Sequence, residues 1–493
     1  MNERILILDG AMGTELVKAG APMGKVPEEL NITHPELIRK IHESYLAAGS
    51  NIIYTNTFGA NPYKCRDSKY GLSELITAGV KIAREAAKPY NARVALSMGP
   101  IGDILEPFGN LKFEDAFSYY KEMISAGDKA GADILVFETQ TDLLEVKAGV
   151  LAAKEISDLP IFVTMTFEEG GRTFTGTLVE SAAITLDALG VSAVGVNCSL
   201  GPDELVPFVE RMRSVTSLPL IVKPNAGLPD PVTGEYGMDA ANFAEAMKPF
   251  IEMGVSYAGG CCGTAPDYIK ALSAVSHPER ATCHPANHQS YLCSARDFVD
   301  VTRVHVIGER INPTGKKLFK EALKNHDLDY IKNQAMEQVD AGAEILDVNV
   351  GLPGIDEKSL MTETVKELQA VVSTPLNIDS SDPAVIEAAL RIYNGKALVN
   401  SVNGEDSTMD AILPLVKKYG AAVIGLTMDS RGIPATASER VEIAGHIVSK
   451  CKSYGIDPKD IYIDCLTLTV GTEQDKALET LKALKEVKER FGV

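Results

Sequence analysis

Three cysteines carry the strongest chemical signal in this 493-residue sequence. Cys198 follows the apolar run AVGVN, and the adjacent pair Cys261 and Cys262 follows the run SYAGG. Three thiolates suit Zn²⁺, with Zn–S distances of about 2.3 Å, and they leave a fourth position open, as in catalytic zinc sites. Because Cys198 lies far from the pair in sequence, the spacing alone leaves buried, metal-free cysteines as an equal alternative.

A repeated unit would bring these cysteines together: a helical stretch, a glycine, a short apolar run and then polar residues. It occurs at 47–59, 129–142, 188–201, 252–263 and 340–351. The glycine suits the left-handed residue that ends a helix. The apolar run is long enough for a strand, and its lack of polar alternation indicates a parallel strand buried on both faces.

Eight such strands are expected before residue 280, at 5–11, 51–59, 93–100, 132–139, 160–168, 193–199, 219–227 and 257–263. Eight strand–helix units in about 270 residues predict a (β/α)8 barrel of the TIM type, with a doubly wound open sheet as the alternative. The three cysteines follow the sixth and eighth strands, so their sulfurs would meet at the C-terminal rim. The neighbouring glycines Gly259, Gly260 and Gly263 would let consecutive cysteines turn toward one metal.

The segment 276–303 breaks the repeat and is interpreted as an interdomain linker. Its cysteines and histidines do not predict a zinc finger, because no Cys-x-x-Cys pair is present and a proline interrupts them; they are Cys283, His284, His288 and Cys293. Six further strands are expected at 304–312, 343–351, 375–381, 397–403, 422–429 and 461–467. The sequence therefore predicts two (β/α)8 barrels in tandem, 1–275 and an incomplete 304–493.

The composition limits the binding partners and the cellular compartment that we expect for this protein. Sixty-seven acidic residues against 48 Lys and Arg give a net charge of −19, which argues against nucleic acid and anionic membranes as partners. No run approaches the roughly 18 apolar residues of a membrane span, and MNERILILDG lacks the apolar stretch of a signal peptide. Eight sparse cysteines favour reduced thiols or metal ligands over disulfides. We expect an acidic cytoplasmic enzyme.

Six motifs resemble the homocysteine S-methyltransferase family, in that family's order. They are LDGAMGTEL (8–16), TNTFGAN (55–61), FET (137–139), GVNCSLGP (195–202), KPNAG (223–227) and GGCCGT (259–264). The resemblance covers residues 4–272 and implies zinc bound by Cys198, Cys261 and Cys262. A free thiol has a pKa of about 8.5, and coordination to zinc would remove its proton, so homocysteine in the open position would be ready for methyl transfer.

The same resemblance directs attention to groups that could bind the amino acid. Asp9 and Glu138 end strands of the barrel and could bind the ammonium, or each could make a structural hydrogen bond there. Backbone N–H groups could bind the carboxylate, and the candidates are Gly10, Ala11 and Ser199. Asn225 could fill the open zinc position before the substrate arrives.

Four later motifs resemble pterin-binding domains, including the methyltetrahydrofolate-binding barrel of cobalamin-dependent methionine synthases. They are IGERINPTG (307–315), AGAEILDVNVG (341–351), LNIDSSDP (376–383) and LVNSVNGE (398–405). The resemblance implies pterin contacts from Asn349, Asp379, Asn400 and Asp464. A carboxylate matches the donor edge of a pterin, and Asn400 could support proton delivery to N5, which improves the leaving group.

Four further polar residues in these motifs have less defined roles. Glu309, Arg310 and Asn312 fit ligand contacts or a rim salt bridge and turn equally well. Asp347 is expected to be structural.

The order of the two resemblances is that of cobalamin-dependent methionine synthase. The expected reaction passes methyl from 5-methyltetrahydrofolate through a cobalamin carrier to zinc-activated homocysteine, giving methionine and tetrahydrofolate. No Asp-x-His-x-x-Gly corrinoid signature is found, so we expect cobalamin on a domain or partner outside this sequence. The alternatives are a cobalamin-independent methyltransferase that uses a small methyl donor, or a scaffold that recruits a corrinoid protein.

Overall fold

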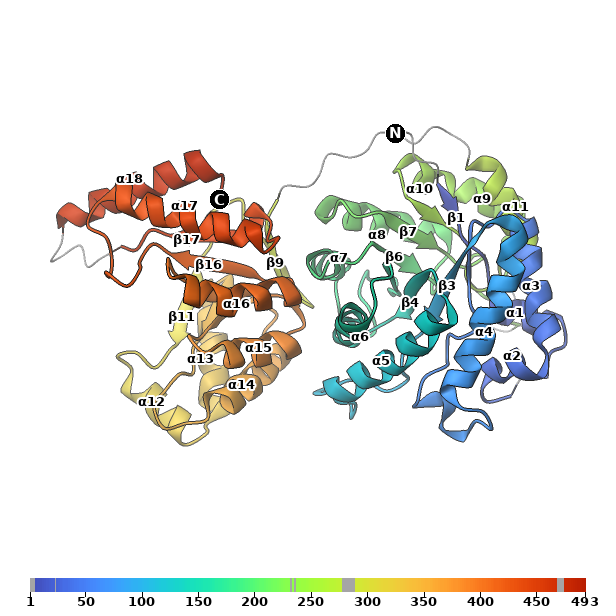
Figure 1. Ribbon diagram of the computed structural model, residues 1–493, viewed down its shortest axis with the longest axis horizontal. Helices are drawn as coiled ribbons and strands as arrows, with labels where there is room; N and C mark the ends of the chain where they lie inside the picture. The colour runs from blue at the N-terminus through green and yellow to red at the C-terminus, as the bar shows by residue number, and fades with distance from the viewer. Residues whose placement is uncertain (1–4, 23, 231–232, 235, 277–288, 468–473) are drawn as a thin grey trace. The chain divides into compact units, whose positions relative to one another are not determined.

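The computed structural model describes residues 5–22, 24–230, 233–234, 236–276, 289–467 and 474–493. The chain divides into two compact units, Met1–Asn287 and His288–Val493, and each is described by itself (Figure 1). Among the described residues, no helix combines the length and the apolar character needed to cross a membrane.

The first unit is built on one parallel sheet of eight strands. The strands are β1 (Leu6–Ile7), β2 (Ile52–Tyr54), β3 (Arg93–Met98), β4 (Ile134–Gln140), β5 (Ile161–Met165), β6 (Ala193–Asn197), β7 (Leu220–Lys223) and β8 (Tyr257–Ala258). Their spatial order follows the chain, β1 pairs with β8, and a parallel bridge from Leu8 to Ile52 closes the ring. The predicted barrel is confirmed, and the open sheet is excluded.

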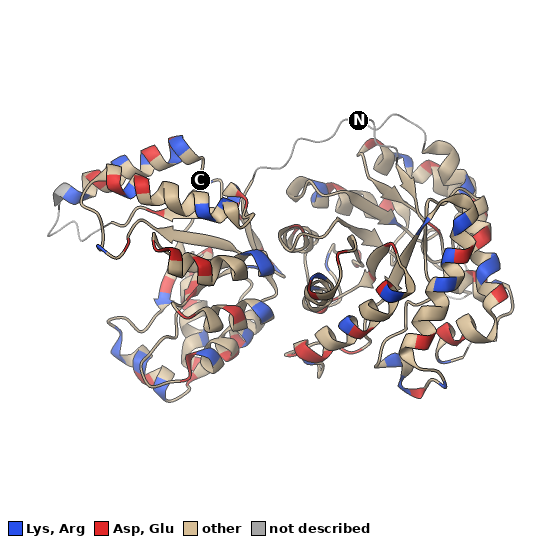
Figure 2. Ribbon diagram, in the orientation of Figure 1, with Lys and Arg blue, Asp and Glu red and all other residues tan. Residues whose placement is uncertain are grey.

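Helices surround this barrel, and apolar side chains fill it. The helices are α1 (Met12–Lys18), α2 (Leu30–Thr33), α3 (Pro35–Ala47), α4 (Leu72–Ala87), α5 (Phe113–Ala130), α6 (Leu143–Ile156), α7 (Val179–Ala188), α8 (Pro202–Val215), α9 (Ala240–Ala246), α10 (Lys248–Glu252) and α11 (Pro266–Val275). Leu8, which follows β1, and Ile52, Ala95, Val136 and Ile221 from four other strands belong to one buried cluster. Charged residues of both signs lie mainly on the helices and loops, whereas the strands carry few (Figure 2).

The second unit contains a six-stranded parallel sheet, and all six predicted strands are present. They are β11 (Ile307–Ile311), β12 (Ile345–Val348), β13 (Leu376–Asp379), β15 (Leu398–Val402), β16 (Ala422–Leu426) and β17 (Ile461–Asp464), in that order across the sheet. The helices are α12 (Lys317–Lys324), α13 (Leu328–Asp340), α14 (Glu357–Val371), α15 (Pro383–Ile392), α16 (Asp406–Tyr419), α17 (Ala437–Ser453) and α18 (Gln474–Phe491). Among the described strands, β11 and β17 are the two edges of this sheet.

Part of the expected linker 276–303 is folded instead. Strands β9 (Tyr291–Ser294) and β10 (Phe298–Asp300) form an antiparallel pair, and β14 (Gly395–Lys396) joins the other side of β9. Leu292 and Val299 pack against the first residues of three sheet strands, because alternate apolar side chains of the hairpin face that end of the sheet. The linker interpretation was therefore wrong for 291–300.

The candidate zinc-finger residues fall mostly outside this hairpin. Cys293 is fully buried in β9, where its Sγ accepts a hydrogen bond from the Lys396 N–H at 3.4 Å. Cys283, His284 and His288 lie outside the described residues.

Candidate functional site

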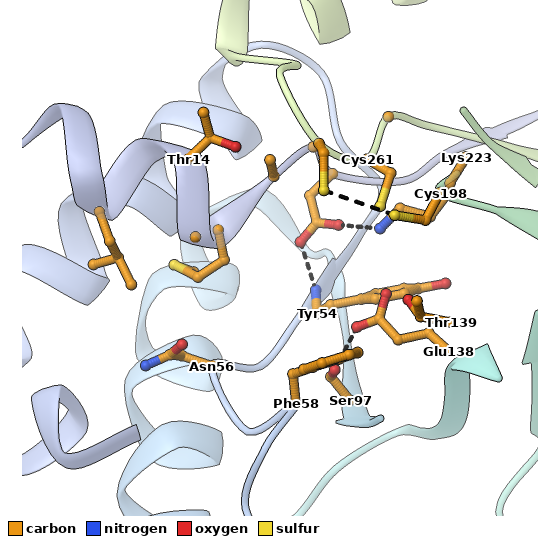
Figure 3. Close-up of a pocket in the computed structure, with 18 of the residues that line it drawn as sticks. Thr14, Tyr54, Asn56, Phe58, Ser97, Glu138, Thr139, Cys198, Lys223 and Cys261 are labelled. Atoms are coloured by element: carbon orange, nitrogen blue, oxygen red, sulfur yellow. Dashed lines mark hydrogen bonds and ion pairs between the residues drawn. The ribbon is translucent and has the colours of Figure 1, made fainter. Parts of the chain in front are cut away.

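A cavity of about 320 Å³ opens at the C-terminal ends of the strands of the first barrel (Figure 3). Its wall comes from β1, β2, β3, β4, β6, β7 and β8 and from the segments that directly follow them. The polar residues in this wall include Asp9, Asn56, Ser97, Glu138, Thr139, Lys223 and the three cysteines Cys198, Cys261 and Cys262. The barrel thus places the predicted zinc ligands and both candidate carboxylates in one cavity.

The three cysteine sulfurs converge. Their Sγ atoms all lie within 4.8 Å of one another, and the Sγ atoms of Cys198 and Cys262 are 3.7 Å apart. Tetrahedral thiolate ligands at a Zn–S distance of 2.3 Å would be separated by about 3.8 Å. The spacing and the soft donor set therefore fit Zn²⁺, with a fourth position available to a ligand in the cavity.

Backbone contacts fix the cysteine pair beyond β8. The Cys261 N–H donates to the Pro224 carbonyl at 2.7 Å, and the Cys262 N–H donates to the Asn225 Oδ1 at 3.1 Å. Gly263 has a φ of +81°, and a Cβ there would come within 2.4 Å of the Tyr236 ring, so the turn requires glycine. The Asn225 oxygen, a candidate for the open zinc position, supports the cysteine loop, and Asn225 lies outside the cavity lining.

The thiols cannot all ionise without a cation. Hydrogen bonds from Cys198 and Cys261 lower the pKa of Cys262 to about 3. Hydrogen bonds with Cys198 and Cys262, together with burial, raise the pKa of Cys261 well above its ordinary value. The cluster by itself therefore favours one negative charge, and a bound divalent cation is what would favour three thiolates.

Asp9 and Lys223 form a buried ion pair in the cavity wall. Each residue is 3% exposed, and the Lys223 Nζ lies 2.9 Å from Asp9 Oδ1. Asp9 Oδ2 accepts the Tyr54 N–H at 2.7 Å, and the Nζ lies 3.7 Å from the centroid of the Tyr54 ring. Burial alone would lower the pKa of Lys223, but the negative groups around it, first among them Asp9, together outweigh burial and raise that pKa. Because both Asp9 oxygens are engaged, this carboxylate is poorly placed to bind a substrate ammonium.

Two further carboxylates line the wall: Glu28, which accepts the Gly59 N–H at 2.6 Å, and Glu138. A register shift between Phe137 and Gln140 interrupts the alternation of β4, and both Glu138 and Thr139 line the cavity. Glu138 accepts a hydrogen bond from the Ser97 hydroxyl, and burial raises its pKa although the charge of Lys223 opposes this. Among the described residues, Glu138 has no salt-bridge partner, so it is the better candidate for a substrate ammonium.

The predicted backbone donors divide into two groups. Gly10 and Ala11 line the cavity just before α1. A Cβ at Gly10 would come within 2.8 Å of both Thr264 Oγ1 and the Tyr45 ring, so only glycine fits there. Ser199 has a φ of +61° and lies outside the lining, and its N–H bonds to Cys198.

The second unit brings three of its four predicted pterin contacts together. Asn349 Nδ2 donates to Asp379 Oδ2 at 2.9 Å, and Asp379 pairs in register with Asn400 on the next strand. Asn400 Nδ2 lies 3.4 Å from Asp347 Oδ1, which also accepts from Asn377 Nδ2 at 2.6 Å. Burial, and secondarily the charge of Asp379, raises the pKa of Asp347 to about 7. Asp347, expected to be structural, therefore joins the predicted group by hydrogen bond.

The other predicted residues of this unit lie toward the sheet edges. Asp464 ends the edge strand β17, is exposed, and accepts the Leu466 N–H at 2.7 Å. Glu309 Oε1 accepts a long hydrogen bond of 3.4 Å from Asn312 Nδ2. The Arg310 N–H donates to Gln338 Oε1 on α13 at 2.7 Å.

The sequence reasoning assigned no role to Lys223 and Asn197, although the quoted motifs contain both. Lys223 ends the apolar run PLIV, and a charged residue at the end of a buried parallel strand is a signal that could have found it. Nothing in the sequence indicated the partners of Asn197, because they lie on strands far away along the chain.

Comparison with known proteins agrees with this geometry. The family model for homocysteine S-methyltransferase matches residues 6–276, more than half of the chain. The chain belongs to the homocysteine S-methyltransferase family. A second family model, pterin binding enzyme, matches residues 308–493.

Curated relatives extend over both units. The methionine synthase of Mycobacterium tuberculosis is 34% identical over 527 residues, covering 99% of this chain and 44% of the relative. That of Mycobacterium leprae is 34% identical over 530 residues, with the same coverage. The chain thus spans less than half the length of these relatives. The oxidized form of the homocysteine methyltransferase MmuM from Escherichia coli is 26% identical, covers 55% of this chain and 95% of its own, and has a TM-score of 0.49.

Proposed function

We propose that this chain supplies the homocysteine and folate modules of a methionine synthase. Methyl would pass from 5-methyltetrahydrofolate through a cobalamin carrier, held by a corrinoid-binding domain or partner, to homocysteine, giving methionine and tetrahydrofolate. The observation that carries the proposal is the convergence of three thiols, at zinc-ligand spacing, in a cavity that also exposes Glu138. The methionine synthase relatives, which match along both units, support the pairing of the two modules.

In the first unit, the residues of the cavity would orient homocysteine by both its ends. Zinc, held by Cys198, Cys261 and Cys262, would supply the chemistry of keeping the substrate sulfur as a thiolate. Glu138 would accept the substrate ammonium, and this positive charge would favour its ionised form against the burial that raises its pKa. The N–H groups around Gly10 and Ala11 would donate to the carboxylate, since both residues line the cavity.

In the second unit, Asp379 would accept the donor edge of the pterin. Asn349 holds one oxygen of that carboxylate by the 2.9 Å hydrogen bond, which fixes its orientation. The Asn400 Nδ2 donates to Asp347 Oδ1, which orients the amide. Asn400 would stabilise a proton on N5 of the folate, and protonated N5 is a better leaving group when the methyl is transferred. Asp464, at the end of the edge strand β17, would add a contact with the pterin.

Zinc stoichiometry and two half-reactions test the proposal. The full chain should bind one zinc, methylate homocysteine from added methylcobalamin, and transfer methyl from 5-methyltetrahydrofolate to free cob(I)alamin. Homocysteine methylation by a small donor such as S-methylmethionine without corrinoid would establish the cobalamin-independent alternative. Absence of methyl transfer to cobalamin, with folate unbound, would support a recruiting scaffold in the second unit.

A further inference from the structure

Asn197 is a buried amide directly behind the candidate site. It is the last residue of β6 and is 1% exposed. Its Oδ1 accepts the Thr139 N–H at 2.9 Å, while its Nδ2 donates to Thr139 Oγ1 at 2.8 Å and to Cys261 Sγ at 3.8 Å. A backbone N–H can only donate, so Oδ1 must face Thr139, and the two Nδ2 hydrogens are left for the hydroxyl and the sulfur. Both Nδ2 hydrogens and one acceptor position of Oδ1 are therefore engaged at this site.

The residue that Asn197 holds has a strained backbone. Thr139 has a φ of +59°, a conformation that a β-branched residue adopts only when its surroundings enforce it. The strain lies at the register shift of β4, where Glu138 and Thr139 both line the cavity. Because Asn197 binds both polar groups of Thr139, it secures the backbone that presents Glu138.

Barrel geometry explains how one side chain reaches both partners. Side chains inside a (β/α)8 barrel form layers, and each layer draws on alternate strands. Thr139 belongs to β4, Asn197 to β6, and Cys261 follows β8. Asn197 therefore connects, through the barrel interior, the strand that carries the candidate ammonium ligand and the loop that carries two candidate metal ligands.

We propose that Asn197 is a positioning residue that fixes the distance between Glu138 and the sulfur cluster, and thereby sets the selectivity for homocysteine. This inference rests on the proposed function. Homocysteine carries its ammonium three carbons away from its sulfur. A substrate anchored at both ends gains from the second anchor only if the two anchors keep a set separation. Loss of Asn197 should then weaken recognition of the ammonium more than binding of the thiol.

The test compares two thiols that differ only in the amino group. Binding of L-homocysteine and of 4-mercaptobutyrate to the zinc-loaded full chain is measured by calorimetry, and zinc affinity is measured separately by chelator competition. The wild type should prefer L-homocysteine. Asn197→Ala should reduce this preference about tenfold, the effect of one lost charged contact, and should also weaken zinc binding. Glu138→Gln should remove the preference with zinc affinity unchanged, and adding Asn197→Ala to it should not lower the preference further.

A matched control separates positioning from general stability. Asn51→Ala removes another amide that bridges two strands, because Asn51 Oδ1 accepts the Ile7 N–H at 2.9 Å, but Asn51 precedes β2 and lies outside the cavity lining. Asn51→Ala should lower the melting temperature and leave the preference for L-homocysteine over 4-mercaptobutyrate unchanged. If Asn197→Ala does not fold, the double variant Asn197→Ala/Thr139→Gly, which relieves the strained φ, takes its place and is compared with Thr139→Gly alone.

Two results would overturn the inference, and they are distinguishable. An Asn197 variant that keeps the wild-type preference for L-homocysteine would refute the positioning role while the proposed function stands. A zinc-loaded wild type that binds 4-mercaptobutyrate as well as L-homocysteine, or binds neither, would refute the proposed function of the first unit and the inference with it.

Discussion

Replacement of Lys223 by methionine should destabilise the first unit strongly at neutral pH and weakly in mild acid. Lys223 and Asp9 are each 3% exposed, so the substitution leaves a carboxylate buried without its cation. Removing one partner of a buried pair costs about 3–5 kcal/mol. Methionine keeps the length of the side chain and an apolar contact with the Tyr54 ring, which isolates the effect of the charge.

The stability of Lys223→Met should depend on pH because Asp9, without its cation, can remain buried only by taking up a proton. Burial raises the pKa of Asp9 even beside Lys223, and loss of the cation raises it further. Folding with a protonated Asp9 costs about 4 kcal/mol at pH 7 and about 1.5 kcal/mol at pH 5, taking an unfolded pKa of 3.9. A raised acid pKa contributes its stability at low pH and loses it as the pH rises, so the penalty must shrink on acidification.

Calorimetry of the full chain at pH 5 and pH 7 measures this effect. A penalty of about 3–4 kcal/mol corresponds to a fall of roughly 6–12 °C in the transition of a unit of this size. Asp9→Asn/Lys223→Met removes both charges and should recover most of the loss at pH 7. Lys396→Met is the matched control, because it breaks the Lys396–Asp460 pair of the second unit. It should lower the melting transition of the second unit and leave that of the first unit unchanged. The reasoning fails if Lys223→Met melts like the wild type, or if its penalty is equal at both pH values.

Three other predictions concern single residues of the two sites. Cys261→Ser should lose tight zinc binding, measured as metal per chain after dialysis against a chelator; full retention of zinc would remove Cys261 from the ligand set. Glu138→Gln should raise the dissociation constant of homocysteine about 10- to 100-fold with unchanged zinc content, and an unchanged constant would assign the ammonium to another group. Burial raises the pKa of Asp347 to about 7, so the second unit should lose about 1.4 kcal/mol of stability per pH unit as the pH rises from about 4, the pKa of an unfolded aspartate, to about 7, and no more above that. Asp347→Asn should abolish this slope in urea unfolding between about pH 4 and pH 7, and a slope that persists would locate the titrating group elsewhere.

The fold could be predicted from the sequence because its strands are buried on both faces. Short apolar runs such as those at 132–139 and 193–199 repeat with a helix between them, and each became a strand of the expected barrel. The hairpin of β9 and β10 was missed for the opposite reason. Its strands are only four and three residues long, and they stand outside the repeat. Their place is decided by packing against Ile345 and Leu398, which lie far along the chain.

The candidate site was predictable where a residue acts from the end of its own strand. Cys198 and Glu138 could be named because the barrel fixes where each strand ends. The pairing of Asp9 with Lys223 could not, since it depends on how β1 and β7 face each other across the barrel interior. Asp9 and Glu138 look alike in sequence, and only the partner of Asp9 distinguishes their roles.

The backbone around the sulfur cluster shows why neighbouring amides matter to the site. In the described part of the chain, positive φ values outside glycine occur at six residues: Asn91, Thr139, Cys198, Ser199, His326 and Leu466. Three of them, Thr139, Cys198 and Ser199, belong to this one site. Each such residue costs about 1–3 kcal/mol, so the local conformation persists only if the surroundings enforce it. The contacts of Asn197 with Thr139 provide such enforcement at that residue, and the Cys198 N–H is held by the Lys223 carbonyl at 3.1 Å. Substitutions that relieve this strain, such as Thr139→Gly, should therefore stabilise the fold while weakening the site, because the strain and the converging geometry have the same origin.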